Sequence, residues 1–231
     1  MNPDVNCKTG MFPTPCDWLL RQNKSLSFKN TLPVLDQLVG GLHPGQVIEL
    51  CGPSGIGKSK VCWHLAGDCL NAGKKVVVVS SRKILGSDLK NLPNSNDLKI
   101  CYVSSVYDLL VTLSALDSMQ VNLLIIDGIQ SLLQAVLGAA HFKGHALLHQ
   151  VKCAIGTAAV KSLVVYTNGL VSVGDGNHGP ALGRSWEIVP SVRIMMLSQP
   201  GGGRVLWRNR EVTARMVVRD KGVEMTWSRT E

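Results

Sequence analysis

Residues 52–59 form the pattern G-x-x-x-x-G-K-S, and this motif constrains the fold more than any other part of the chain. Its members are Gly52, Pro53, Ser54, Gly55, Ile56, Gly57, Lys58 and Ser59. Glycines allow the backbone to wrap around phosphate oxygens, with peptide N–H groups turned inwards. An apolar, strand-like run (46–51) precedes the motif, and a helix is predicted over 60–70. This order predicts an α/β domain that binds a nucleoside triphosphate, and the alternative is a glycine-rich turn with an idle lysine.

A second signal for nucleotide binding comes from the apolar run 123–126, which ends in Asp127. In proteins with a phosphate-binding loop, such an aspartate holds the Mg²⁺ shell, while the loop hydroxyl, here Ser59, ligates the ion. Lys58 would place its ammonium near the β- and γ-phosphates. Alternatively, Asp127 caps a helix that begins after Gly128. Taken together, these residues predict ATP and Mg²⁺ as cofactors.

The spacing of apolar runs predicts the fold class. Strands buried on both faces are expected at 75–80, 99–103, 121–127 and 162–167, with helices at 106–119 and 145–160 between them. This alternation predicts a mostly parallel central sheet flanked by helices. A short helix capped by Thr31 is expected near 31–38. From 193 onward, four strand-like runs joined by turns predict a C-terminal antiparallel meander.

Composition is consistent with one domain. We expect a tail or linker over residues 1–30, which are rich in proline and lack periodicity, and an ATP-binding core over 31–231. The first ten residues lack the apolar region of a secretory signal, which predicts an intracellular protein. Seven cysteines without a C-x-x-C pair are interpreted as reduced core residues. A net charge of +8 favours a polyanionic partner such as nucleic acid.

The segment after the strand at 75–80 reads Ser80-Ser81-Arg82-Lys83. Hydrolysis of ATP needs a group that orients or deprotonates the attacking water, often a carboxylate at the tip of a neighbouring strand. Here two hydroxyls and two cations stand at that position, and Asp88 is the nearest carboxylate downstream. We therefore expect ATP to be bound firmly and cleaved poorly.

The chain resembles the RecA-type ATPase core of eukaryotic recombinase paralogues, nearest to the subfamily lettered D. The resemblance rests on the loop 52–59, the strand ending at Asp127, the Y-T-N run 166–168 and, above all, G-P-A-L-G-R-S-W-E-I-V-P-S-V-R-I over 179–194. It implies a RecA-like core and a part in homologous-recombination repair in the nucleus. It also implies other recombinase paralogues, the recombinase filament and single-stranded DNA as partners.

The resemblance assigns further roles by position. Thr167 and Asn168 would form the polar sensor that links the γ-phosphate to DNA-facing loops, which correspond to 128–144 and 170–184. Within these loops, Lys143 and Arg184 would contact DNA phosphates. Phe12 would be the linker aromatic that inserts into a neighbouring subunit, although it could instead pack on its own core.

The chain departs from the family pattern in two respects. The thirty residues before the core are too few for the small helical domain of the D subfamily, and the glutamate of active recombinases is missing after the second strand. The sequence thus predicts an ATP-binding subunit that promotes or stabilises recombinase filaments, with weak or no hydrolysis. The alternative is a DNA-stimulated ATPase in which Asp88 or a partner supplies the carboxylate. A small-molecule kinase lacks support, because no acceptor pocket or lid sequence is evident.

Two further clusters of residues could each be either a binding site or an ordinary exposed surface. His141, His145 and His149 recur every four residues on one helix face, which fits a metal site, an exposed face or a DNA-proximal cluster. The meander concentrates cations beside an aromatic and could bind nucleic acid or form an ordinary solvated surface. Its members are Trp207, Arg208, Arg210, Arg215 and Arg219.

Overall fold

The computed structural model describes residues 32–93, 96–137, 142–174, 177–199, 204–208, 211–219 and 222–227. Its helices are α2 (Pro33–Val39), α3 (Lys58–Asn71), α4 (Gly86–Leu89), α5 (Val106–Leu116), α6 (Ile129–Leu137) and α7 (Phe142–Lys161), with a 3-10 helix η2 (Arg184–Trp186). Its strands are β1 (Val47–Cys51), β2 (Val76–Ser80), β3 (Leu98–Tyr102), β4 (Leu123–Asp127), β5 (Leu163–Asn168), β6 (Leu170–Gly174), β7 (Asn177–Pro180), β8 (Val192–Ser198), β9 (Arg204–Arg208), β10 (Glu211–Arg219) and β11 (Gly222–Trp227).

Nine of the described strands form one sheet in the order β11-β10-β9-β8-β1-β5-β4-β2-β3. From β8 to β3 all neighbours are parallel, and from β8 to β11 all are antiparallel. This confirms the predicted mostly parallel sheet with a C-terminal antiparallel meander. β8 belongs to both parts, because it pairs in parallel with β1 and antiparallel with β9.

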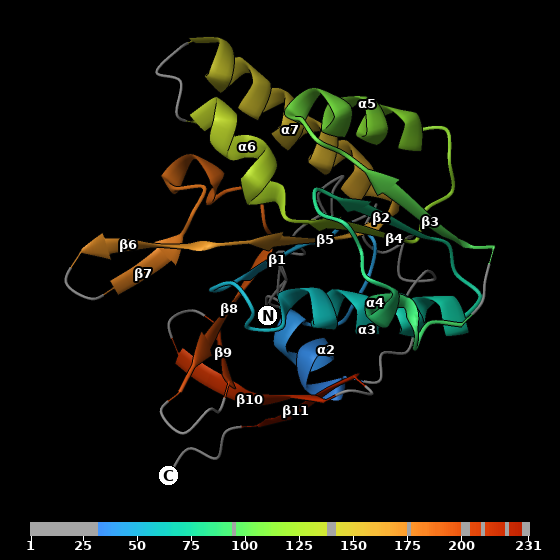
Figure 1. Cartoon of the computed structure of the whole chain (residues 1–231), viewed down its shortest axis with the longest axis vertical. Helices are drawn as coiled ribbons and strands as arrows, with labels where there is room; N and C mark the ends of the chain where they lie inside the picture. The colour runs from blue at the N-terminus through green and yellow to red at the C-terminus, as the bar shows by residue number, and fades with distance from the viewer. Residues whose placement is uncertain are drawn as a thin grey trace, which may run out of the picture.

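Helices cover both faces of the sheet, with α5, α6 and α7 on one side and α2, α3 and α4 on the other (Figure 1). Strand β2 explains how the core divides between the two faces. Its side chains alternate, so that Val76 and Val78 lie in the cluster with α2 and α3, while Val77 and Val79 lie in the cluster with α5 to α7. A central strand with two buried faces therefore has the continuous apolar run that the sequence displays.

Three local expectations are corrected. β3 is half-exposed instead of buried on both faces, because it pairs only with β2 at the sheet edge and leaves Tyr102 60% exposed. The N-cap of α2 is Leu32 without a side-chain hydrogen bond, and Pro33 begins the helix. Of the cysteines taken as core residues, Cys153 is exposed on α7.

The two segments matched to DNA-facing loops contain regular structure. The first includes α6 and the start of α7, while the second folds into an antiparallel hairpin of β6 and β7 followed by η2. Figure 1 shows this hairpin projecting from the body of the molecule beyond the carboxyl end of β5. Within the described ranges, none of the helices combines the length and apolar character needed to span a membrane.

Candidate nucleotide site

The phosphate-loop motif lies between the carboxyl end of β1 and the start of α3, as the sequence predicts. Gly55 and Gly57 have φ values of 76° and 110°, in the left-handed region that favours glycine. A Cβ added to Gly52 would lie 2.6 Å from the carbonyl oxygen of Met196 on β8. One at Gly57 would lie 2.9 Å from Val218 on β10. Glycine is therefore required in this motif for two reasons: some positions have a positive φ, and some lie too close to β8 or β10 for a side chain.

The first turn of α3 offers hydrogen-bond donors to an anion. No side chain caps this helix, and its first backbone N–H groups have no acceptor within the helix itself. Lys58 Nζ donates to the carbonyl oxygens of Gly52 (2.7 Å) and Pro53 (2.8 Å), so the loop folds around the ammonium. Burial lowers the pKa of Lys58, and the opposite charge of Asp127 counteracts that effect. The cradle of N–H groups and its lysine fit the phosphates of a nucleotide.

Asp127 at the end of β4 is the acceptor around which the site is organised. Its carboxylate is 4% exposed, and Oδ1 accepts hydrogen bonds from Ser59 Oγ (3.0 Å) and Thr167 Oγ1 (2.7 Å). Thr167 Oγ1 in turn accepts from the backbone N–H of Gly128 (2.7 Å). The hydrogen bonds that the structure describes for this carboxylate come from side chains of other elements, which disfavours a role in capping α6. Ser59 and Asp127 therefore lie together, and their role as the residues that would hold Mg²⁺ stays a prediction.

Arg82 binds the second oxygen of the same carboxylate. Its Nε and Nη2 lie 3.1 Å and 2.9 Å from Asp127 Oδ2, and its side chain is 43% exposed. The register Ser80↔Asp127 between β2 and β4 brings the segment after β2 over the end of β4. The sequence indicated a cation at this strand end, but its pairing with Asp127 was not predicted.

A cavity of about 400 Å³ opens beside Arg82 at the carboxyl ends of β2 and β3. Its described lining residues are Ser80, Ser81, Arg82, Lys83, Tyr102, Val103 and Ser104, none of which carries a carboxylate. Asp88 does not line this cavity. Its Oδ2 accepts a hydrogen bond from the backbone N–H of Leu85 (3.3 Å) at the start of α4. The position next to the loop therefore holds hydroxyls and cations, as the sequence indicates.

Glu49, in the middle of β1, forms a buried network that the sequence analysis missed. It is fully buried, accepts from Asn168 Nδ2 (2.7 Å) and forms an ion pair with Arg193 Nε on β8. Burial acts to lower the pKa of Arg193, but the charge of Glu49 acts in the other direction, and the pKa is raised above its ordinary value. The signal was available: each is a charged residue in an otherwise apolar strand. Asn168 therefore faces Glu49, while its neighbour Thr167 faces Asp127, and their sensor role stays a prediction.

The stretch that carries the resemblance is anchored through Trp186. This side chain is buried, donates from Nε1 to the hydroxyl of Tyr166 (3.0 Å) and meets that ring edge-on at 87°. Lys152 lies 5.8 Å from the centre of the indole ring and donates to the carbonyl of Ser185. At the base of the hairpin, Ala181 N donates to Gly169 O (3.0 Å). The tryptophan is thus a core residue that fixes where the hairpin leaves the sheet.

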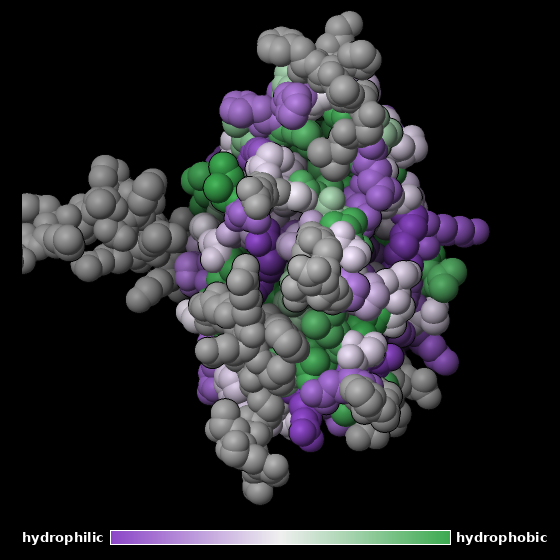
Figure 2. All heavy atoms as spheres, turned by 90° about the vertical axis from the view of Figure 1, so that its left-hand side faces the viewer, coloured by the Kyte–Doolittle hydropathy of each residue, from purple (hydrophilic) through white to green (hydrophobic). Residues whose placement is uncertain are grey.

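For several other residues with a predicted role, the structure does not describe the side chain. Lys143 lies in α7 and Arg184 in η2, but their side chains are outside the described part, as is Phe12 altogether. In the meander, Arg215 is exposed, and the side chains of its four partners are not described. Figure 2, which faces the hairpin side, shows hydrophobic and hydrophilic residues interspersed. DNA and partner contacts at these positions therefore stay predictions.

The histidine cluster is placed only in part. His145 and His149 are exposed on α7, whereas His141 lies outside the described residues. His149 Nδ1 is 3.7 Å from Cys153 Sγ. Among the residues described, no group of three or more potential metal ligands comes together. The geometry of these side chains is that of an exposed helix face.

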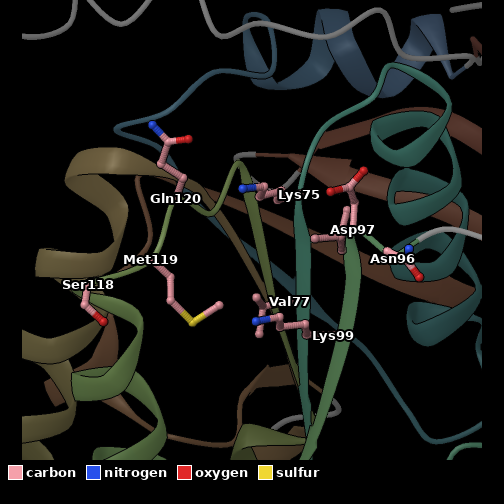
Figure 3. Close-up of a pocket in the computed structure, with 9 residues that line it drawn as sticks. Lys75, Val77, Asn96, Asp97, Lys99, Ser118, Met119 and Gln120 are labelled. Carbon is pink, nitrogen blue, oxygen red and sulfur yellow. The ribbon is translucent and has the colours of Figure 1, made fainter.

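A larger cavity, of about 510 Å³, lies at the opposite end of the strands. Figure 3 shows Ser118, Met119 and Gln120 on one side of it and Lys75, Asp97 and Lys99 on the other. Lys75, Asp97 and Lys99 lie at the amino ends of β2 and β3, and residues 118–120 lie between α5 and β4, whereas the phosphate loop follows the carboxyl end of β1. This cavity is therefore separate from the candidate nucleotide site.

Comparisons with known proteins agree with the RecA-like fold. The chain is 27% identical over 203 residues to the DNA repair protein RAD51 homolog 4 of Bos taurus, covering 75% of this chain and 62% of that protein. For the protein of the same name from Mus musculus, identity is 29% over 197 residues, covering 73% and 60%. The DNA repair and recombination protein RadB of Methanococcoides burtonii is 33% identical over 67 residues, covering 29% of this chain and 30% of RadB.

No protein-family model matches the chain. The chain spans about three fifths of the length of the two RAD51 homolog 4 proteins. Similarity over most of the chain and the observed sheet order together identify a RecA-like core.

Proposed function

We propose that this protein is the ATP-binding subunit of a recombinase-paralogue complex that promotes or stabilises recombinase filaments on single-stranded DNA during homologous-recombination repair in the nucleus. The observation that carries the proposal is the convergence of Ser59, Asp127 and Thr167 beside the phosphate loop. Of these residues, Ser59 and Asp127 are the types that hold Mg²⁺ in proteins with a phosphate-binding loop. The names of the similar proteins, two RAD51 homolog 4 proteins and RadB, support a setting in DNA repair and recombination. Membership of the D subfamily is part of the proposal and rests on the resemblance over residues 179–194.

Weak or absent hydrolysis is part of the proposal. The cavity at the ends of β2 and β3 presents hydroxyls and cations among its described lining residues, without a group that could deprotonate water. Asp88 is engaged at the start of α4. The chain's own residues would therefore bind and orient the triphosphate, while Mg²⁺, when bound, would supply charge neutralisation of the phosphates.

Binding without turnover has a physical use in an assembly. A ligand that binds the assembled state more tightly than the separate subunits stabilises that state by mass action, and no hydrolysis is required. The phosphate loop contacts β8 and β10 through Gly52 and Gly57, so a bound nucleotide would reinforce the loop against the meander. The net charge of +8 favours association with DNA or an acidic partner in the same complex.

Nucleotide binding and turnover by the purified chain test the proposal directly. A fluorescent ATP analogue is titrated at equilibrium, and phosphate release is measured with and without single-stranded DNA. We expect saturable binding with negligible release in both conditions. Lys58→Ala should weaken binding by about tenfold or more, as expected for loss of a charged hydrogen-bonding group.

Lys90→Ala, an exposed lysine at the end of α4, is the matched control and should bind like the wild type. Absence of saturable binding would refute the nucleotide-binding function. DNA-stimulated phosphate release that Lys58→Ala abolishes would refute the non-hydrolysing subunit and favour an active ATPase.

A further inference from the structure

Arg82 contacts Oδ2 of Asp127, the carboxylate that the proposed function assigns to Mg²⁺. Oδ1 of Asp127 is already bound by Ser59 and Thr167, and Oδ2 receives both Nε and Nη2 of Arg82. The guanidinium donates a hydrogen bond from Nε and approaches the same oxygen with Nη2 in an ion pair, so it is attached to this carboxylate at two nitrogens. Arg82 thus places a fixed positive charge at the carboxylate that the proposed function assigns to Mg²⁺.

The local charge supports this interpretation. Where a hydrolytic site has a carboxylate after the second strand, this chain has Arg82, which changes the local charge by roughly two elementary charges. That is the charge a Mg²⁺ ion brings. Among the described residues, Lys58 interacts with Asp127 through its charge, and Arg82 forms an ion pair with the same carboxylate. Cations therefore already outnumber carboxylates before a metal ion binds.

We propose that Arg82 is a resident cation of the nucleotide site, which holds Asp127 and lets the chain retain a nucleoside triphosphate with little dependence on Mg²⁺. The inference rests on the proposed nucleotide-binding function and specifies its ionic requirement. Arg82 is 43% exposed and borders the cavity at the ends of β2 and β3, so the guanidinium is accessible to a phosphate oxygen as well as to Asp127. Its role is to bind and position, with no part in bond cleavage.

The competing interpretation is an ion pair that breaks when Mg²⁺ and nucleotide bind together. In that case Mg²⁺ would displace Arg82 from Oδ2, and nucleotide affinity would depend strongly on the ion. The two interpretations predict a small and a large loss of nucleotide affinity on removal of Mg²⁺, so the ionic dependence of binding separates them without any assay of catalysis.

The experiment measures the affinity of a non-hydrolysable fluorescent ATP analogue in Mg²⁺ and in excess EDTA. We expect the wild-type dissociation constant to rise by less than about tenfold on removal of Mg²⁺. Arg82→Gln should weaken binding in EDTA by about tenfold or more, because a charge-assisted hydrogen bond is lost. Arg82→Lys, which keeps the charge without the planar fork, should give an intermediate value.

Lys83→Gln is the matched control, since it removes a neighbouring cation for which no contact with Asp127 is described, and it should behave like the wild type. Near-ultraviolet circular dichroism checks that each variant is folded. A wild-type affinity that falls by about tenfold or more in EDTA, or an Arg82→Gln affinity in EDTA equal to that of the wild type, would overturn the proposal. Wild-type protein that binds in neither buffer would refute the proposed function itself.

Discussion

The ion pair between Glu49 and Arg193 leads to a prediction about stability. Whether replacement of Glu49 lowers or raises the free energy of unfolding should depend on whether Arg193 is present. Glu49 on β1 is 0% exposed, whereas the Arg193 side chain on β8 is 26% exposed. Replacing either member leaves the other charge without its partner. Because the carboxylate is the more deeply buried group, removal of Arg193 should be the more damaging change.

The magnitudes follow from this difference in burial. Arg193→Met leaves a fully buried carboxylate for which Asn168 is the remaining donor among the described residues, and loss of one partner from a buried pair costs about 3–5 kcal/mol. Glu49→Gln keeps an acceptor for Asn168 and leaves an arginine whose side chain is only partly buried, which should cost about 1–3 kcal/mol. For a chain of 231 residues, the first loss corresponds to a fall in Tm of about 6–20 °C.

The double variant Glu49→Gln/Arg193→Met contains neither charge. Glu49→Gln should therefore destabilise the wild type but stabilise the Arg193→Met background, since it removes an uncompensated buried carboxylate. Urea unfolding followed by circular dichroism measures all four proteins. Arg215→Met on β10 is the control for an exposed arginine and should stay within about 0.5 kcal/mol of the wild type. Equal destabilisation by Glu49→Gln in both backgrounds would refute this account.

Three further predictions follow from the glycines and the buried thiols. Gly52→Ala should abolish nucleotide binding in a filter-binding or fluorescence assay, because its Cβ would meet the backbone oxygen of Met196, and unchanged affinity would contradict the geometry. Gly156→Ala, in the middle of α7 with open space around it, should raise the free energy of unfolding by about 0.5–1 kcal/mol, and a loss would argue against a regular helix there. Burial raises the pKa of Cys51 and Cys69 to about 12, above the ordinary value of 9.0. The unfolded chain therefore loses these protons first, and the free energy of unfolding should fall between pH 9 and about 12, measured by urea titration at fixed pH; a flat profile would contradict the burial of these thiols.

Local patterns in the sequence predicted much of the architecture. The phosphate loop is a continuous motif, and strands such as β2 and β4 are short apolar runs between turn residues, so neither requires knowledge of distant contacts. The sequence did not predict the hairpin of β6 and β7, because β7 reads N-H-G-P and lacks the apolar alternation of a half-buried strand. Its placement depends on tertiary contacts, including the burial of Trp186 against Tyr166.

The ionic contacts of the site were beyond local reasoning for a different reason. Glu49 and Arg193 are 144 residues apart in the chain, and only the parallel register of β1 and β8 makes them neighbours. Arg82 reaches Asp127 because β2 pairs with β4, which follows it by more than forty residues. A lone charged residue in an apolar strand is the sequence signal that could have pointed to Glu49, although it does not name the partner.

The meander also determines how small a working version of this protein can be. The phosphate loop is contiguous in sequence with β1 and α3, which suggests that a fragment ending after β5 would keep the motif intact. Yet Gly52 lies against Met196 on β8, and Gly57 lies against Val218 on β10. A fragment truncated before β8 would retain every motif residue and lose the residues against which the loop packs, so we expect the smallest fragment that forms the candidate nucleotide site to extend through β10.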